Sequence, residues 1–310
     1  MKLHAAVEQY IGLKTSLGFR FRADSVILRA FRRAMGCVKL GDVKPTRVRA
    51  YLDGTGPLTR FWERKWVTLR GFYRFAQARG LVRQSPWPKV PPKPPPPFVP
   101  YIYSRAELRR LLAAVPAEPI AGLTPATLRT LLLLLYGAGL RLSEALNLNE
   151  AQVDLEACLL TICQSKFFKT RWVPISPQLA QFLARYRAPH PHRVGNRGRP
   201  FFRSVTGEPV RRSAAERAFR TLRQAARVQR SDGARYQPRL HDLRHTFAVH
   251  RLLAGYRQGA DVQSLLPALA TYLGHMDVAA TQHYLTLSPE LSRHASRRFE
   301  EYAFPGGSHE

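Results

Sequence analysis

Residue types that act on phosphate esters gather between residues 240 and 285. The stretch begins LHDLRHTFAVH, where leucine and phenylalanine at helical spacing predict a helix over residues 241–254. Positions three and four apart share a helix face, so one face carries two imidazoles and a permanent cation: His241, Arg244 and His245. This part of the chain therefore offers charge and proton-transfer groups on a rigid element.

The same stretch then supplies a phenol. It continues as TYLGHMDVAATQHYL, in which Gly274 ends a helix and His275 adds a third imidazole. Tyr284 follows nine positions later, after an alanine-rich and helical segment. Cations that hold phosphate oxygens, a hydroxyl that attacks phosphorus and an acid for the leaving oxygen are what phosphodiester cleavage needs. Because free tyrosine has a pKa near 10, the surrounding positive charge belongs to this hypothesis.

These residues resemble a known family. The pair His241 and Arg244, the Leu273-Gly274-His275 box and Tyr284 are similar to the second signature block of the tyrosine recombinases, the phage integrase family. Their ordered combination is far more specific than any single histidine, which is more often a satisfied core or surface residue.

A zinc site is an alternative reading of the same helix. Two imidazoles at i and i+4 mimic a helical zinc protease motif, but that motif needs glutamate where Asp242 stands. Arg244 would also place a cation one turn from the metal. We therefore expect no metal and no other cofactor.

Composition narrows the function classes. The 310 residues include 49 Lys and Arg against 21 Asp and Glu, for a net charge of +28, which indicates a polyanionic partner. The longest apolar run, residues 131–136, is far shorter than the roughly 18 residues of a membrane span. The first ten residues lack the apolar core of a signal peptide, and three cysteines form neither a paired framework nor a zinc spacing. We expect a cytoplasmic, nucleoid-associated protein without membrane contact.

The N-terminal part reads as a helical, basic domain over residues 1–84. Apolar residues at helical spacing predict four helices, the last over residues 59–78 with aromatics on one side and basic residues on the other. Residues 1–90 hold 19 Lys and Arg against 5 acids, a net +14, which favours a phosphate-binding surface. The resemblance implies the family's core-binding domain here, and we expect DNA contacts from Arg60, Arg64, Lys65 and Arg70.

Prolines dominate residues 85–101, which excludes a helix and favours an extended linker between two domains. A second domain is expected over residues 102–287. Thr124 and Pro125 mark a helix start, and the apolar run that follows predicts a buried central helix. That helix stops at glycines before LRLSEALNL, which resembles the family's first signature block. The resemblance implies that Arg141 is catalytic and that Glu144 supports the site.

Two β-like segments, residues 158–162 and 172–175, predict a hairpin. The family places its catalytic lysine on this hairpin. Counting back from Val173-Pro174 gives Lys166, with Lys169 as the alternative, and Lys169 and Arg171 are also expected to contact DNA. An arginine-rich helix is expected over residues 213–228, and its arginines fit binding in the major groove and contacts to the DNA backbone equally well.

The sequence thus predicts a mainly α fold with small β-hairpins: a helical core-binding domain plus an α+β catalytic domain. The implied activity is site-specific DNA recombination through a 3′-phosphotyrosyl intermediate, independent of metal and ATP. The expected catalytic set is Arg141, Lys166, His241, Arg244, His275 and Tyr284, supported by Glu144 and His245. A type IB topoisomerase and a non-catalytic DNA-binding accessory protein are the alternatives.

The expected partner is double-stranded DNA with paired recombination half-sites. The protein is expected to be a monomer that assembles as a dimer or tetramer on DNA, alone or with partner recombinases. Residues 288–310 begin with a helix start, and their apolar stripe predicts packing on the own domain or docking on a neighbouring protomer.

Overall fold

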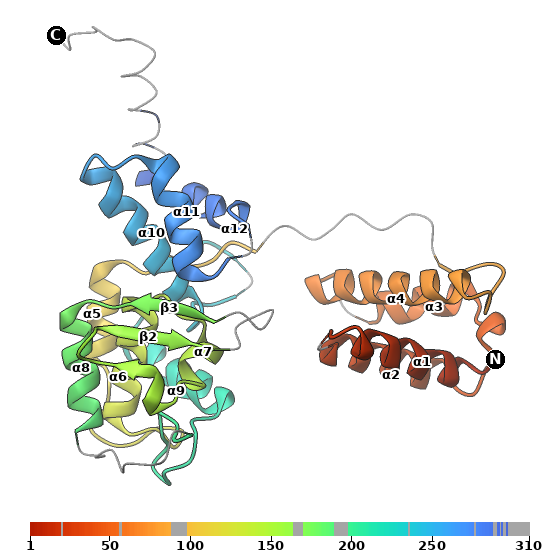
Figure 1. The fold of residues 1–310 in the computed structure, drawn as a ribbon, viewed down its shortest axis with the longest axis horizontal. Helices are drawn as coiled ribbons and strands as arrows, with labels where there is room; N and C mark the ends of the chain where they lie inside the picture. The colour runs from red at the N-terminus through yellow and green to blue at the C-terminus, as the bar shows by residue number, and fades with distance from the viewer. Residues whose placement is uncertain are drawn as a thin grey trace, which may run out of the picture. The chain divides into compact units, whose positions relative to one another are not determined.

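The computed structural model describes residues 1–19, 21–55, 58–87, 98–163, 170–188, 198–234, 236–275 and 277–287, together with residues 290, 291, 293 and 296. The chain forms two compact units, Met1–Phe98 and Val99–Glu310. Helices dominate both units, and a three-stranded sheet lies in the second (Figure 1). The predicted fold class is confirmed.

The N-terminal unit is a helical bundle. Its elements are α1 (Leu3–Ser16), α2 (Arg22–Met35), the short 3-10 helix η1 (Leu40–Asp42), α3 (Pro45–Asp53) and α4 (Arg60–Ala78). The helices α1, α2 and α3 all pack against α4. The bundle core therefore forms around one long helix, as the aromatic spacing predicts.

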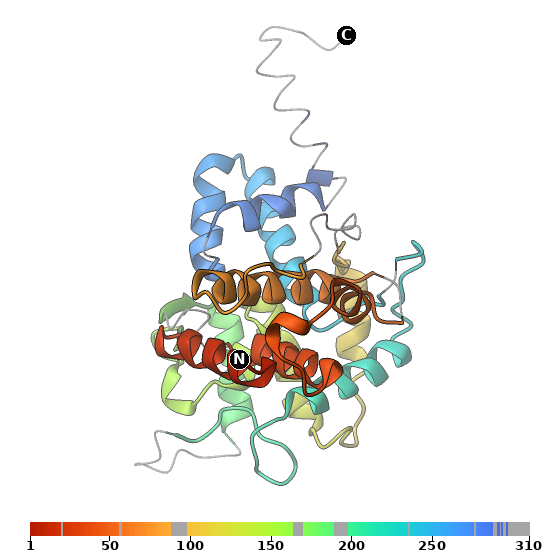
Figure 2. The ribbon, with the colours of Figure 1, turned by 90° about the vertical axis from the view of Figure 1, so that its right-hand side faces the viewer.

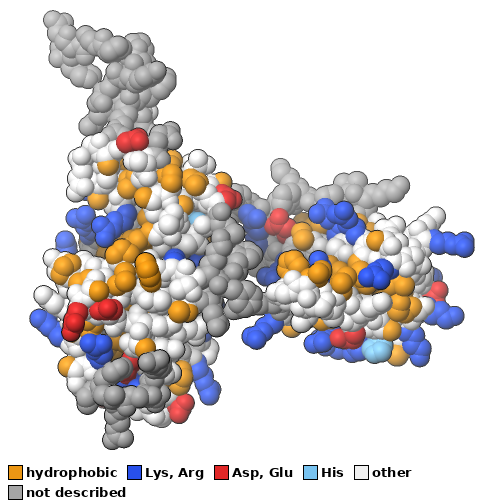
Figure 3. Space-filling model, viewed as in Figure 1, with side chains coloured by type: hydrophobic (Ala, Val, Ile, Leu, Met, Phe, Trp, Pro, Cys, Tyr) orange, Lys and Arg blue, Asp and Glu red, His pale blue; other side chains and the backbone are white. Residues whose placement is uncertain are grey.

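The apolar face of α4 explains this packing. Trp62, Trp66, Leu69 and Phe72 recur at helical spacing and are buried. The Trp62 and Trp66 rings stack at 5.1 Å, and Trp87 covers Trp66 at 4.3 Å. The opposite side of the helix is left for basic residues. Lysine and arginine side chains are prominent on the visible face of this unit, where acidic ones are few (Figure 3).

The C-terminal unit contains the remaining elements. In chain order they are α5 (Arg105–Ala113), α6 (Pro125–Gly137), α7 (Leu142–Leu146), η2 (Glu150–Gln152), β1 (Val153–Asp154), β2 (Leu159–Ile162), β3 (Arg171–Pro174), α8 (Pro177–Arg187), α9 (Arg212–Ala225), α10 (Asp242–Arg257), α11 (Val262–Leu273), α12 (Ala279–Gln282) and η3 (His283–Thr286). In two perpendicular views, α10, α11 and α12 gather at one end of the unit (Figure 1, Figure 2).

Helix α6 is the centre of this unit. The Thr124 hydroxyl accepts from the Thr127 amide at 3.1 Å, and Pro125 occupies the first turn, so the helix begins where the sequence predicts. Its leucines are buried on several sides, and the helix packs against α7, α8 and α10. None of the described helices is long and apolar enough to cross a membrane.

The sheet has the order β1-β2-β3, with both pairs antiparallel. Leu160 faces Val173 across the β2–β3 pair, and both side chains are fully buried. Because side chains alternate along a strand, Trp172 points away from the core and is 72% exposed. The predicted hairpin is therefore present, although its connecting residues 164–169 lie outside the described part of the chain.

Helix α11 contains Pro267 and ends at Leu273. The Asp261 carboxylate accepts from the Ser264 amide at 3.2 Å and so caps its first turn. Gly274 follows at φ +67°, a left-handed conformation that favours glycine. The helix end therefore turns sharply into His275.

Candidate active site

Arg141 directly precedes α7, and Glu144 on that helix binds its side chain. The Glu144 carboxylate accepts from the Arg141 amide at 3.0 Å and from Arg141 Nη1 at 2.7 Å. Gly139, at φ +58°, turns the chain between α6 and α7, and a Cβ there would overlap the Phe247 ring. The first signature block thus holds a partly exposed guanidinium beside the Glu144 carboxylate.

Glu144 is the buried negative charge of the site. Its side chain is 7% exposed and also receives Arg171, with Nη1 at 3.1 Å and Nη2 at 2.9 Å. Burial would raise the pKa of Glu144, but the hydrogen bonds and charge of Arg171 and Arg141 outweigh it and hold the pKa at about 2. The carboxylate therefore stays ionised at any physiological pH.

Arg244 lies on α10 and is almost completely buried. Its Nη1 donates to the Gly139 carbonyl at 2.8 Å, and its Nη2 donates to the Leu273 carbonyl at 2.7 Å. Burial, together with the charge of Arg141, lowers the pKa of Arg244 to about 10. The guanidinium remains charged at neutral pH and is fixed between the two signature blocks.

Two imidazoles lie at the start of α10. The His241 and His245 rings pack edge to face at 5.0 Å. Loss of hydration, then the charges of Arg244 and Arg239, lowers the pKa of His241 to about 4, although this side chain keeps an exposed surface. Burial and the neighbouring His241 lower the pKa of His245 to about 3. Both rings are therefore neutral at pH 7, when each imidazole has one donor and one acceptor nitrogen.

His275 follows the end of α11. Its Nδ1 lies 2.7 Å from the hydroxyl of Thr281, which is fully buried. Burial and the charges of Arg244 and Arg141 lower the pKa of His275 to about 4. Because Nδ1 is used within the protein, Nε2 is the nitrogen available to a substrate.

Tyr284 lies on η3 and is 3% exposed. Its ring centre is 5.6 Å from that of His245 and 6.1 Å from that of His275. Burial raises the pKa of the Tyr284 phenol, while the charge of Arg244, a hydrogen bond with Arg244 and the charge of Arg141 lower it. The phenol is therefore neutral in this structure and lies against cations that favour its deprotonation.

The structure brings together most of the residues that the two signature blocks predict, from α7, α10, the end of α11 and η3. The members of this cluster are Arg141, Glu144, His241, Arg244, His245, His275 and Tyr284. The predicted lysines, Lys166 and Lys169, lie outside the described residues. Within the described part of the chain, no three His, Cys, Asp or Glu side chains are placed to hold a metal ion.

The expected DNA contacts of the N-terminal unit stay a prediction. Arg60 pairs with Glu63, and Arg64 pairs with Asp24, but both arginines keep about half of their side-chain surface exposed. Lys65 donates to the Tyr51 and Leu52 carbonyls at 2.7 and 2.5 Å, so its ammonium is engaged at the end of α3. Arg70 is exposed.

Two contributors were missed as members of the site. Arg171, expected to contact DNA, turns its guanidinium inward to Glu144, and Thr281 holds His275. Alternation along β3 could have placed Arg171 opposite the exposed Trp172. No local signal marks Thr281, whose partner is fixed by the turn after α11.

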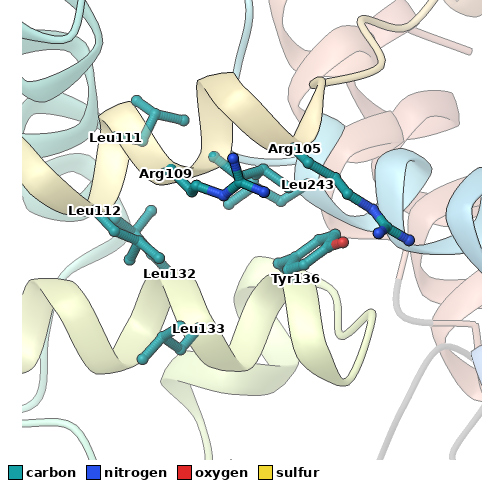
Figure 4. A pocket seen from close by; sticks show the side chains of 9 residues that line it. Arg105, Arg109, Leu111, Leu112, Leu132, Leu133, Tyr136 and Leu243 are labelled. Carbon is teal, nitrogen blue, oxygen red and sulfur yellow. The ribbon is translucent and has the colours of Figure 1, made fainter.

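Two hollows lie near these elements. A basic one of about 390 Å³ is lined by His241, by Glu216 and by four arginines of α9 and the loop before α10: Arg212, Arg220, Arg223 and Arg239. A second one of about 250 Å³, between α5, α6 and Leu243 of α10, is mostly apolar (Figure 4). Leu111, Leu112, Leu132 and Leu133 line it, and none of the expected catalytic residues does. Only the first hollow adjoins the cluster and suits an anion.

Sequence comparisons cover nearly the whole chain. The chain is 35% identical over 307 residues to an integrase/recombinase of Sinorhizobium fredii, y4rB, across 95% of this chain and 96% of that protein. It is 33% identical over 299 residues to the tyrosine recombinase XerC of Rhodospirillum centenum, across 92% of this chain and 81% of that protein.

Structural comparisons give the same architecture. The Tn1549 transposon integrase, solved in complex with transposon right end DNA, superposes with a TM-score of 0.71 at 15% identity, over 99% of this chain and all of the other. A lambda integrase dimer bound to a COC′ core site superposes with a TM-score of 0.64 at 18% identity, over 90% of this chain and 97% of the other. The phage integrase family profile matches residues 103–290, which include both arginines, the three imidazoles and the tyrosine. By sequence and fold, the chain belongs to the phage integrase family of tyrosine recombinases.

Proposed function

We propose that this protein is a site-specific DNA recombinase that cuts and rejoins DNA through a 3′-phosphotyrosyl intermediate. One observation carries the proposal: Tyr284 lies against Arg244 within a cluster assembled from both signature blocks. The Tyr284 oxygen attacks phosphorus, and the phosphodiester bond to the departing 5′ oxygen breaks. The new ester conserves the bond energy, so rejoining needs neither metal nor ATP.

The cations hold the charge that develops on the phosphate. Arg141 and Arg244 bind the nonbridging oxygens, and both are fixed before substrate arrives, which avoids reorganisation during reaction. His275 Nε2 donates a further hydrogen bond, because Thr281 engages Nδ1. His241 assists proton transfer from the phenol as a neutral imidazole, and Lys166 protonates the 5′ oxygen.

We assign DNA binding to both units. The basic helical unit, with its core over residues 1–84, is the core-binding domain, and residues 85–101 link it to the catalytic domain. The arginine-lined hollow beside His241 supplies phosphate contacts next to the scissile bond. The natural substrate is double-stranded DNA with paired half-sites, on which the protein assembles as a dimer or tetramer. Lambda integrase has been solved as a dimer on a core site and as a tetramer on a Holliday junction. The reaction takes place on the nucleoid, in the cytoplasm.

Covalent capture tests this proposal. Protein–DNA adducts are recovered from cells under denaturing conditions and the joined DNA ends are sequenced, which also identifies the recombination site. A nicked substrate carrying that site then traps the adduct in vitro. Wild-type protein is expected to accumulate adduct in EDTA, whereas Tyr284→Phe binds the same DNA and forms none. Adduct formation by Tyr284→Phe, or activity that requires added zinc, would refute the proposal.

The recombination site found in this way also allows a test that separates recombination from topoisomerase activity. Two duplexes that each carry the site are expected to yield recombinant joints. Relaxation of a supercoiled plasmid without any recombinant product would instead indicate a type IB topoisomerase. DNA binding without an adduct at any site would indicate an accessory protein.

A further inference from the structure

Three consecutive carbonyl oxygens at the end of α11 each accept from a different arginine. Arg171 Nε donates to Tyr272 at 3.1 Å, Arg244 Nη2 donates to Leu273 at 2.7 Å, and Arg141 Nη2 donates to Gly274 at 3.0 Å. These arginines come from β3, α10 and the start of α7. One helix end therefore holds three guanidinium groups from three distant parts of the chain.

The physical reason is the free end of a helix. The last carbonyls of a helix lack an amide partner and carry partial negative charge, so they favour cations. Gly274 allows the close approach, because a Cβ at this position would lie 3.0 Å from Arg171 Nη1. The glycine of the Leu273-Gly274-His275 box thus serves the backbone turn and the packing of Arg171 alike.

Glu144 clamps the other side of the same array. Its Oε1 accepts from Arg141 and Arg171, and its Oε2 accepts from the Arg141 amide and Arg171. All three guanidinium nitrogens of Arg171 are thereby used within the protein, and the side chain is 12% exposed. The Arg141 side chain is 25% exposed and so keeps a surface that solvent can reach. The two arginines therefore differ in what they can offer to a phosphate.

We propose that Arg171 is a positioning residue, which sets Arg141 and the Leu273–His275 turn through Glu144 and the Tyr272 carbonyl instead of contacting DNA. The inference rests on the proposed function for the reaction it supports. Both candidate lysines, Lys166 and Lys169, come shortly before β3 in the sequence, and Arg171 is the first residue of that strand. The contact thus ties the strand that follows the lysines to the cation array.

The test compares Arg171→Gln and Arg171→Lys with the control Arg185→Gln, which removes an exposed charge from α8. Amide hydrogen exchange measures the stability of the α11 end and needs no enzymatic activity. The Gly274 and His275 amides are its probes, because they donate to the Thr271 and Ala270 carbonyls at that end. Arg171→Gln is expected to speed their exchange about tenfold through local opening. Arg171→Lys keeps the positive charge but has one donor nitrogen in place of three, so its exchange rates should lie between those of wild type and Arg171→Gln. Arg185→Gln should leave the exchange of both amides unchanged.

The rate of covalent adduct formation measures the effect of each variant on the proposed reaction. In Arg171→Gln we expect roughly 10- to 100-fold slower adduct formation, the size typical of groups that orient a catalytic centre, with partial rescue in Arg171→Lys. The DNA dissociation constant stays within about twofold, because Arg171 makes no phosphate contact.

The pH profile separates positioning from general loosening. Glu144 faces Arg141 from its own turn, Arg171 from β3 and, at 3.9 Å, Arg244 from α10. Without Arg171, the pKa of the Glu144 carboxyl rises, so the deficit of Arg171→Gln grows as pH falls from about 8 to about 5.5. A deficit that does not change with pH would overturn the proposal that Arg171 acts through the Glu144 carboxylate.

The outcomes keep the two ideas apart. Failure of wild-type protein to form any adduct would sink the proposed function, while the exchange data would still decide the role of Arg171. Unchanged exchange at Gly274 and His275 in Arg171→Gln would overturn the inference. So would a loss of DNA affinity that accounts for the whole defect, because Arg171 would then be a direct DNA contact. If Arg171→Gln does not fold, Arg171→Lys provides the same readings.

Discussion

Replacing Glu144 by glutamine removes a buried carboxylate that pairs with Arg141 and Arg171 and lies 3.9 Å from Arg244. The substitution Glu144→Gln keeps the shape of the side chain but replaces an acceptor oxygen with an NH₂ group. That group would face arginine donors, since both carboxylate oxygens now accept hydrogen bonds from Arg141 and Arg171. The variant therefore loses its ion pairs with Arg141 and Arg171 and gains a donor–donor conflict around a side chain that is only 7% exposed.

The size of the effect follows from the pKa. The site lowers the pKa of Glu144 from 4.5 to about 2, which corresponds to roughly 3 kcal/mol of folded-state stabilisation by the ionised form. A depressed carboxyl pKa stabilises the fold above the unfolded value of 4.5, and this contribution is lost as pH falls through about 2. At pH 7, the free energy of unfolding of Glu144→Gln should therefore be about 3 kcal/mol lower than that of wild type. The difference should narrow below about pH 4.5.

The free energy of unfolding is measured in urea from the hydrogen exchange of the α6 amides, which report on the C-terminal unit alone. The matched control is Glu216→Gln, which breaks the exposed pair with Arg212 on α9 and should cost less than about 1 kcal/mol. A loss below about 1 kcal/mol in Glu144→Gln, or a difference that stays constant from pH 7 to pH 3.5, would refute this account of the site.

Four further outcomes are expected. Arg244→Ala should slow adduct formation by at least about 100-fold while the protein still binds DNA, and near-normal rates in trapping assays would exclude Arg244 from the transition state. Gly139→Ala should lower the unfolding free energy by roughly 2–4 kcal/mol, since it combines a φ of +58° with overlap on Phe247. Gly122→Ala, at φ +80° in open space, is its control and should cost only about 1 kcal/mol in the same urea titration. Adduct formation should be equal in EDTA and in zinc-supplemented buffer when measured on denaturing gels. Truncation after Thr286 should preserve single-site binding and weaken cooperative binding at paired sites in mobility-shift assays, and equal assembly would show that the tail does not connect protomers.

The sequence by itself determined where several of the helices and the β2–β3 hairpin lie. A cap and a proline at Thr124-Pro125 begin α6. These signals act within one turn of a helix, so a local reading suffices. Helical spacing likewise placed His241 and Arg244 on α10. The candidate site residues were predicted on a different basis, the order of the two signature blocks along the chain, and the structure brings most of them together.

Only the tertiary structure decided which side chains share a partner. Arg171 and Glu144 are 27 residues apart, and the contacts of Arg171 with Tyr272 and of Arg141 with Gly274 span 101 and 133 residues. Alternation along β3 places Arg171 on the face opposite the exposed Trp172, but it does not show whether the guanidinium binds DNA or a carboxylate, because both partners require the same group. The distinction arises when α7, β3 and the end of α11 pack together: burial then removes water from Glu144, and the unpaired carbonyls of one helix end set the direction of each arginine.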